Sequence, residues 1–401
     1  MGNAVLQAAT LERRPRVAGR AIEATRAAAI PWYVWCLAAA VTSSAFGGYW
    51  DISWHISIGR DSFWTPAHMA IYLGGVLAGV ASGYMILTST FGSSAESRET
   101  SVSIWGFRGP LGCFLAAWGG IAMLTSAPFD NWWHSAYGLD VKIVSLPHSM
   151  LSAGIGMISL GALLLVCAQV NRATGARRAK LDRMLLYVGA IEIVQAALFN
   201  LESTPMEFMH NPMFYRSVAE GFPLVLIAVS CVSTSRWPAT TMAAIYTAAF
   251  LAALWIFPLF PAQPKLGPVY QHITHMVPLW FPVLIIVPAF VLDLLRVKMG
   301  ERWGGIKSAL LAGCVFVAAL FAVQWPFADF LISPASRNWV FGTMYFSYND
   351  PANLLYNPYR FADPAKTHAA FVEGMALAVL ASIIFCTIGM GLGHWMRKVQ
   401  R

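Results

Sequence analysis

Apolar runs of about 20 residues recur along the chain, separated by shorter polar stretches. A run of that length, wound as an α-helix, crosses the hydrocarbon core of a bilayer. The pattern therefore predicts an all-α protein, a polytopic transmembrane bundle of about ten helices with no separate soluble domain. The predicted spans are residues 31–50, 66–90, 110–127, 147–169, 183–201, 217–234, 239–259, 277–295, 306–327 and 369–394.

Basic residues gather on one side of this predicted bundle. Ten spans place both termini on the same side, and the tails and loops of that side hold 20 of the 27 Lys and Arg residues. Because Lys and Arg mark cytoplasmic loops, we expect both termini in the cytoplasm and the protein in the plasma membrane. The connections 51–65, 128–146, 202–216, 260–276 and 328–368 then face outward.

Composition agrees with a lipid environment and excludes other classes. Hydrophobic residues make up 57% of the chain and charged residues 11%, whereas soluble proteins carry about 25% charge. The net charge of +8 comes from the short loops and does not indicate a nucleic-acid partner. The six cysteines lie inside apolar runs without CxxC spacing, so they indicate neither disulfides nor a thiolate metal site.

Three regions follow from this pattern. Residues 1–29 are polar and Arg-rich and are predicted as a cytoplasmic tail. Residues 30–170 form two outward-opening helical hairpins, and residues 171–401 add further transmembrane helices with a long outer-face loop at 328–368.

Histidines are concentrated at the outer ends of the predicted helices. Eight of the nine lie there, and imidazole is the commonest metal ligand, so the outer face is the expected working face. These eight are His55, His68, His134, His148, His210, His272, His275 and His368.

The first two outward connections carry the same motif, YWDISWHISIGRDSFWTPAHM in one and PFDNWWHSAYGLDVKIVSLPHSM in the other. Four residue pairs match at one constant offset, and a third histidine follows in each copy after one inserted residue. We interpret this as an internal duplication of a helix hairpin. The matching pairs are Asp51 and Asp130, Trp54 and Trp133, His55 and His134, Asp61 and Asp140, and then His68 and His148.

The spacing within each copy predicts a metal site. Asp51 and His55 are four residues apart, so they share a face if the first helix continues past residue 50. Thr65 and Pro66 predict the start of the next helix, which puts His68 in its opening turn at the same depth. Two imidazoles and one carboxylate leave coordination positions open, as catalytic or exchangeable metal sites do.

The second copy repeats this construction with Asp130, His134 and His148. A carboxylate and an imidazole one turn apart can also simply hydrogen-bond at a wet interface. Asp61 and Asp140 are interpreted as acceptors for a ligand imidazole or as ordinary loop charges, not as ligands.

The first motif resembles the metal-binding membrane subunit of the copper membrane monooxygenases, the particulate methane and ammonia monooxygenases. That family has an Asp, a His four residues on and a His thirteen further, in a stretch like WHxxxxRDxxFTPxH; here the stretch reads WHISIGRDSFWTPAH. The family's second site has an Asn, a His four on and a His fourteen further. Asp130, His134 and His148 keep those intervals, with a carboxylate in place of the amide. The resemblance covers about residues 45–165.

The resemblance implies a copper site at Asp51, His55 and His68, and a second site to which His134 and His148 belong. Asp130, in place of the family's amide, makes that second site more anionic than the family's. It also implies oxygenase-like or cupredoxin-bearing partner proteins and a ring of identical protomers. The ligand set alone accepts zinc, non-haem iron or copper, so copper rests on the resemblance. The sequence identifies no catalytic residue.

The leading functional hypothesis is a copper-binding membrane oxidoreductase, an oxygenase or oxygenase-related subunit that acts on a small apolar substrate at the outer face. The alternative is non-catalytic copper acquisition, storage or delivery. A transporter is less favoured because ionisable residues inside the spans are few, Glu192 and Glu373 among them. A haem protein would need histidines deeper in the bundle.

Three further outer-face segments carry weaker signals. His272 and His275 share a helical face if that stretch is helical. Glu202, Glu207 and His210 form another set of oxygen and nitrogen ligands, which an ordinary polar loop also explains. The 328–368 connection is rich in Asn, Pro and Tyr and is predicted as a turn-rich cap.

Overall fold

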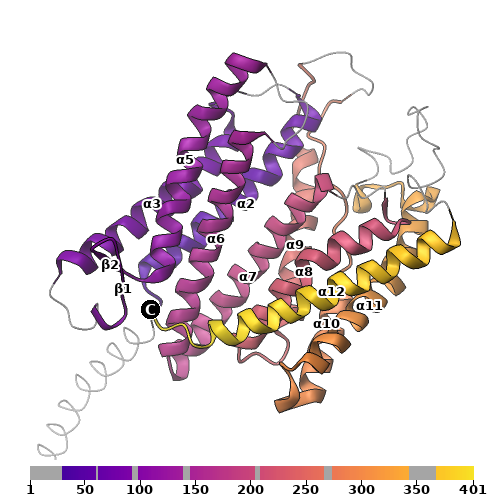
Figure 1. Cartoon of the computed structure of the whole chain (residues 1–401). Coiled ribbons are helices and arrows are strands. Elements are labelled where there is room, and N and C mark those ends of the chain that lie inside the picture. The colour runs from indigo at the N-terminus through magenta and orange to yellow at the C-terminus, as the bar shows by residue number, and fades with distance from the viewer. Residues whose placement is uncertain are drawn as a thin grey trace, which may run out of the picture.

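The computed structural model describes residues 29–59, 62–92, 98–138, 145–203, 208–265, 273–342 and 367–401. Within these ranges the chain forms ten α-helices packed as a bundle (Figure 1). They are α2 (Trp32–Ser57), α3 (Pro66–Phe91), α5 (Leu111–Tyr137), α6 (Leu146–Arg172), α7 (Gly175–Ser203), α8 (Pro212–Val232), α9 (Pro238–Ile256), α10 (Ile286–Met299), α11 (Ile306–Ile332) and α12 (His368–Met396).

Eight of these helices are long and apolar enough to cross a membrane, which confirms the prediction of a multi-pass helical membrane protein. The other two are α2 and α10. Helix α2 has 26 residues but is less apolar, and α10 has only 14 residues.

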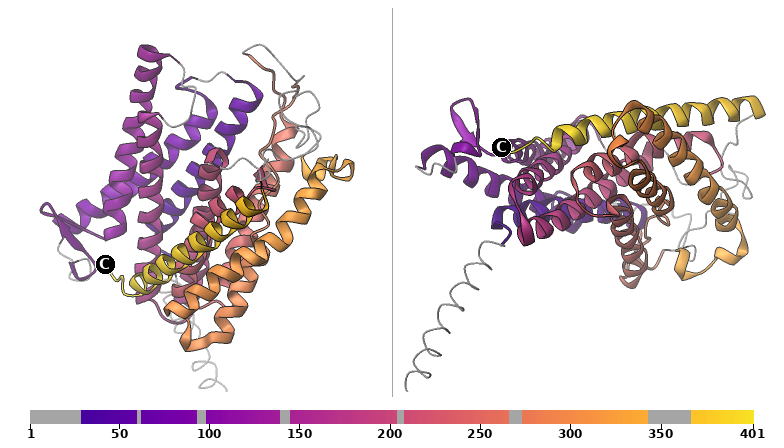
Figure 2. Two further views of the ribbon diagram at one scale, coloured as in Figure 1. Left: turned by 45° about the vertical axis from the view of Figure 1, so that its right-hand side comes forward. Right: turned by 90° about the horizontal axis from the view of Figure 1, so that it is seen from below.

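Two antiparallel hairpins, α2–α3 and α5–α6, pack side by side through α3 and α5 (Figure 1). Helix α12 packs along α8 and ends beside α6, as the yellow helix in Figure 2 shows. There the amide of Asn171 donates to the carbonyls of Met396 and Val399, at 2.8 and 2.7 Å. The amide of Gln169 donates to the hydroxyl of Tyr33 at 2.9 Å. The start of α2 and the end of α12 therefore lie at the same end of the bundle.

Glycines bring the helix backbones of both hairpins into contact. A Cβ on Gly154 would lie 2.8 Å from the carbonyl oxygen of Gly119, and a Cβ on Gly74 would lie 2.8 Å from that of Ala40. Gly112 and Gly161 abut each other's carbonyls in the same way. No side chain fits at these contacts, so small residues set the closest approach of the paired helices.

The predicted span 277–295 is wrong over its first part, because residues 277–285 are not helical and α10 begins only at Ile286. Pro278 and Pro282 cannot donate the backbone hydrogen bonds of a helix. Non-helical backbone inside a membrane bundle is tolerated where the protein satisfies its polar groups. Here four backbone amides donate to side chains of other helices over 2.7–3.1 Å. The Val277 amide donates to Ser57 Oγ, and the Leu279 amide donates to the Tyr49 hydroxyl. The Val283 amide donates to the Tyr246 hydroxyl, and the Leu284 amide donates to Gln324 Oε1.

A small antiparallel hairpin, β1 (Val102–Ile104) and β2 (Phe107–Gly109), precedes α5. Trp105 and Gly106 both have positive φ, 51° and 86°, as a two-residue turn of this kind requires. Trp105 is 85% exposed at the tip, where an amphipathic ring suits the headgroup region. Strands of three residues are too short for a hydropathy pattern to predict.

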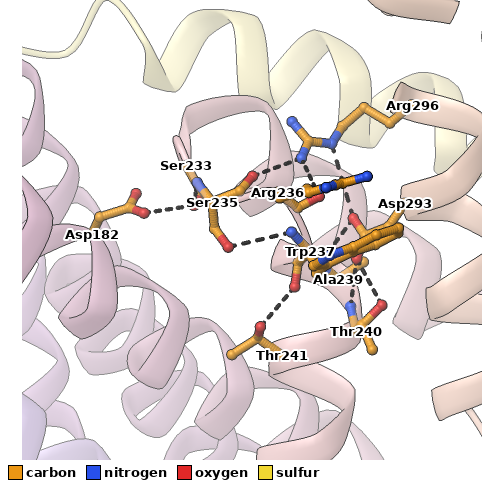
Figure 3. A network of polar contacts seen from close by, with 10 residues as sticks. All are labelled: Asp182, Ser233, Ser235, Arg236, Trp237, Ala239, Thr240, Thr241, Asp293 and Arg296. Atoms are coloured by element: carbon orange, nitrogen blue, oxygen red, sulfur yellow. Dashed lines mark hydrogen bonds and ion pairs between the residues drawn. The ribbon is translucent and has the colours of Figure 1, made fainter. Parts of the chain in front are cut away.

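The end of the bundle that holds the start of α7 is organised by two buried carboxylates (Figure 3). Asp182 on α7 accepts a hydrogen bond from the Ser233 hydroxyl at 3.0 Å. Asp293 on α10 accepts from the Thr240 amide at 2.8 Å and so caps the start of α9. Arg296 donates to the carbonyl of Ser235 at 2.8 Å. These groups tie α7, α9, α10 and the α8–α9 connection together, which is a structural role.

Replacing Gly154 with alanine should destabilise the α5–α6 hairpin, because its Cβ would press on backbone atoms of α5 that cannot move aside. We expect Gly154→Ala to lower the free energy of unfolding by about 1–3 kcal/mol. Thermal unfolding of the detergent-purified protein, followed by circular dichroism, measures this. The matched control is Gly156→Ala on the same helix, where a Cβ meets nothing within 4 Å. Equal melting temperatures for the two variants would contradict the packing argument.

Candidate metal centre

The first Asp/His/His cluster is assembled from the end of α2 and the start of α3. Helix α2 continues to Ser57, so Asp51 and His55 lie one turn apart on the same helix. Thr65 is the N-cap of α3 and Pro66 its first residue, which puts His68 in the opening turn. Asp51 Oδ1 is 3.1 Å from His68 Nε2, and Asp51 Oδ2 is 3.9 Å from His55 Nε2. One ligand atom from each residue lies within 4.8 Å of the other two.

These distances fit a shared metal ion. Ligand atoms about 2.0–2.2 Å from one ion stand roughly 3–4 Å from each other. Both distances to Asp51 lie in that range, and the His55 side chain is 47% exposed. Asp51 and His68 are more enclosed, at 21% and 15% exposed. The 3.1 Å contact between them is also the length of a charge-assisted hydrogen bond.

The second cluster, at the end of α5 and the start of α6, is more open. Asp130 Oδ2 is 3.4 Å from His134 Nε2, and Asp130 Oδ1 is 3.7 Å from His148 Nδ1. The centroids of the two imidazole rings are 6.4 Å apart. Across the described part of the chain, only the first cluster brings three such ligand atoms within 4.8 Å of one another. The second therefore pairs each histidine with Asp130 without closing a triad.

Local contacts orient the histidines of the second cluster. Ser145 is the N-cap of α6; its hydroxyl accepts from the His148 amide at 3.4 Å and lies 2.7 Å from His148 Nδ1. His134 Nδ1 lies 3.1 Å from the carbonyl of Gly138, where α5 ends. The His134 contact uses the ring nitrogen that faces away from Asp130, as in metal sites where an outer partner fixes the rotation of a ligand imidazole. In His148 the same Nδ1 faces both Ser145 and Asp130.

The two clusters face one small cavity. Asp51 and His68 line it from one hairpin, and Asp130 and His148 line it from the other. It offers about 30 Å³ to a water-sized molecule, which is room for one or two waters. The clusters therefore form one polar centre between the hairpins.

A second, larger cavity adjoins this centre and is mainly apolar. It has a volume of about 440 Å³ and lies among α2, α3, α6 and α7. Asp51 and His148 contribute to its wall, while Gln195 hydrogen-bonds to Ser159 at 2.6 Å on the α6–α7 side. Its apolar lining includes Ile71, Leu151, Ile155, Leu198 and Phe199. An apolar chamber with a few polar groups at one wall is typical of a small-molecule site.

Of the other predicted residues, some lie outside the described part of the chain and two, His275 and His368, are exposed. The described residues do not include Asp61, Asp140, Glu207, His272 or residues 343–366 of the predicted outer loop. The side chain of Glu202 is also not described. His275 lies in an extended segment and bridges to Pro261, so its spacing from His272 does not place the two on one helical face. His368 is the exposed first residue of α12.

His210 has a partner that the sequence did not reveal. Its Nε2 is 3.1 Å from Asp329 Oδ1, and its ring lies 4.7 Å from that of Trp325, both on α11. Burial lowers the pKa of His210, while the nearby Asp329 carboxylate raises it. Asp329 is far away in sequence, and the sequence indicated only that both residues lie in connections predicted for the same side of the bundle. The pair supplies one imidazole and one carboxylate at the same end of the bundle as the clusters.

The fold and the centre define the class of this protein, a multi-pass helical membrane protein with apposed Asp/His clusters at one end of two hairpins. Comparisons with protein-family models, curated proteins and solved structures found no match for the chain.

Ser145→Ala should loosen the first turn of α6 beside His148. Loss of an N-cap hydroxyl costs about 1 kcal/mol, and the variant should unfold at a lower temperature and exchange the first-turn amides faster. Thermal unfolding and hydrogen exchange read by mass spectrometry measure both effects. Ser135→Ala is the control, because the exposed Ser135 hydroxyl only donates to the carbonyl of Asn131 within α5. If the two variants behave alike, Ser145 does not hold this turn.

Proposed function

We propose that this protein is a membrane-embedded copper-binding oxidoreductase, an oxygenase or oxygenase-related subunit that acts on a small apolar substrate. The observation that carries the proposal is the convergence of one carboxylate and two imidazoles, within 4.8 Å, at a centre that borders an apolar cavity. The choice of copper rests on the resemblance of Asp51, His55 and His68 to the triad of the copper membrane monooxygenases.

In this proposal each residue of the first cluster has a defined task. Asp51 provides the anionic ligand, and His55 and His68 provide neutral imidazole nitrogens from the two helices. Bound copper would supply one-electron redox chemistry toward dioxygen. The apolar side chains of the 440 Å³ cavity hold a small apolar substrate beside the centre and limit the access of water.

Asp130, His134 and His148 form a second copper site in the proposal, more anionic than the amide-containing second site of the family it resembles. Only the first cluster brings three ligand atoms within 4.8 Å of one another in the described part of the chain, which supports weaker binding at the second. Since both clusters line one cavity, the two sites act as a single centre.

The interpretation of the hairpins as duplicates has support from their packing. Gly74 packs against Ala40 and Ser44 in the first hairpin, and Gly154 packs against Gly119 and Met123 in the second. Ala40 and Gly119 occupy corresponding positions of the two hairpins, because they are separated by the same number of residues as Asp51 and Asp130. The same holds for Ser44 and Met123. Gly74 matches Gly154 by the offset that relates His68 to His148. A shared packing contact beside a shared ligand pattern favours copies of one metal-binding unit.

We further propose that both termini are cytoplasmic and that the centre faces outward in the plasma membrane. The distribution of Lys and Arg supports this orientation. By the same resemblance, oxygenase-like or cupredoxin-bearing proteins and further copies of the chain are the expected partners.

Copper acquisition, storage or delivery is the second candidate function. The observation that favours it is the 47% exposure of the His55 side chain, which leaves one proposed ligand within reach of a soluble donor or acceptor. Exchange of this kind needs an open ligand but no apolar cavity.

Metal stoichiometry tests the copper centre. Full-length protein in detergent is loaded with copper, desalted and analysed for metal, as wild type, as His55→Ala/His68→Ala and as His134→Ala/His148→Ala. We expect each double variant to lose a separate share of the copper, because each removes two of three ligands. The control His275→Ala/His368→Ala removes two exposed histidines outside the clusters and should keep all of it. Wild type without copper, or equal losses in the control, would sink the proposal.

Filling the apolar cavity separates the two candidate functions. Ser152 lines the cavity, so Ser152→Phe should reduce substrate-dependent oxygen consumption at least tenfold while leaving the copper content unchanged. Oxygen uptake by copper-loaded protein is measured with a quinol reductant and a short alkane. Ala153→Phe, at the exposed neighbouring position, is the control. If wild type shows no alkane-dependent uptake but passes copper rapidly to a chelator, the delivery function replaces the oxidoreductase.

A further inference from the structure

A third cavity, larger than the two at the metal centre, forms an open groove between α2 and α7. It has a volume of about 900 Å³, and none of its lining residues belongs to either Asp/His/His cluster. It occupies the half of these helices nearer to their N-termini. Its lining includes Trp35, Ala39, Phe46, Lys180, Arg183 and Met184.

Positive charge is confined to one end of this groove. Lys180 and Arg183 lie near the start of α7, and both side chains are exposed. Neither forms an ion pair with an acidic side chain in the part of the chain that the structure describes. Two cations without a protein counterion, placed at the mouth of a groove, attract an anionic group.

The rest of the groove is apolar. The α2 side of the groove extends from Trp35 to Phe46. At the helical rise per residue, this is a length of roughly 16 Å. The polar atoms on its floor are already satisfied, because the Thr42 hydroxyl donates to the carbonyl of Ala38 at 2.7 Å and lies 2.7 Å from the Tyr187 hydroxyl. The groove therefore offers apolar contact along its length and charge only at its end.

We propose that this groove binds an anionic phospholipid, with the phosphate at Lys180 and Arg183 and an acyl chain along α2 and α7. Basic pockets between transmembrane helices suit acidic lipid headgroups. A soluble anion would gain nothing from the apolar walls, and a zwitterionic lipid would leave the two cations uncompensated. The N-terminal segment 1–28 is itself Arg-rich, so like charge disfavours it as the occupant. This proposal does not depend on the copper function.

Lipid binding by the full-length, delipidated protein in neutral detergent tests the proposal. Native mass spectrometry follows titration with dioleoyl phosphatidylglycerol or dioleoyl phosphatidylcholine. We expect wild type to prefer phosphatidylglycerol and Lys180→Ala/Arg183→Ala to bind it roughly thirtyfold more weakly, as two lost basic contacts predict. Arg302→Ala/Lys307→Ala, which removes two exposed cations elsewhere on the same side of the predicted bundle, should bind like wild type.

A second variant tests the groove itself. Ala39 is exposed on its wall, so Ala39→Phe fills the acyl path and leaves both cations in place. We expect it to weaken phosphatidylglycerol binding at least tenfold without changing the melting temperature of the lipid-free protein. Unchanged binding by Ala39→Phe would overturn the proposal in favour of headgroup attraction at the surface. Equal affinity of wild type for the two lipids would also overturn the proposal. So would a wild-type dimer that Ala39→Phe abolishes, because a second copy of the chain would then occupy the groove.

Discussion

The structure depends on the close approach of helix backbones at small residues. Lipid gives helices no hydrophobic reason to associate, so their contact area and packing must hold them together. Gly119 and Gly154 let α5 and α6 touch, and Gly74 lets α3 rest on the backbone of α2. Helices are stiff, so a fixed crossing in the apolar region also fixes where their polar ends meet. Between the hairpins, Gly120 lets α5 rest on the backbone of α3 at Gly75. The positions of Asp51, His68, Asp130 and His148 around one cavity follow from these contacts together.

Carboxylates in this protein fall into structural and candidate functional groups according to their partners. Asp182 and Asp293 accept hydrogen bonds from backbone amides and hydroxyls and join neighbouring helices. Asp51 and Asp130 instead face imidazoles on two helices each. Asp329 is intermediate, with one imidazole and a largely exposed side chain. The difference in partner chemistry separates a helix cap from a candidate metal ligand better than burial does.

Much of the fold could be predicted from hydropathy, because each long apolar run has to become a helix in lipid. The prediction failed at residues 277–285, where an apolar run contains two prolines and its amides bond to side chains of other helices. Hydropathy also ended the first span at residue 50, whereas α2 continues to Ser57, because helices extend beyond the hydrocarbon region. The histidine and aspartate spacing located both clusters. Their shared cavity and the pairing of His210 with Asp329 needed the packing of helices distant in sequence.

The apposition of the clusters creates an electrostatic problem that bears on the proposed copper. Asp51 and Asp130 line one small cavity, and like charges repel. Protonated histidines could balance them, but an imidazolium has no lone pair left for a metal. A bound cation balances a carboxylate while it keeps the imidazoles neutral as ligands. In the proposed function, copper at one cluster therefore lowers the cost of bringing the other hairpin close. Metal binding and hairpin packing then support each other. Two independent sites at separate helix ends would not have this effect.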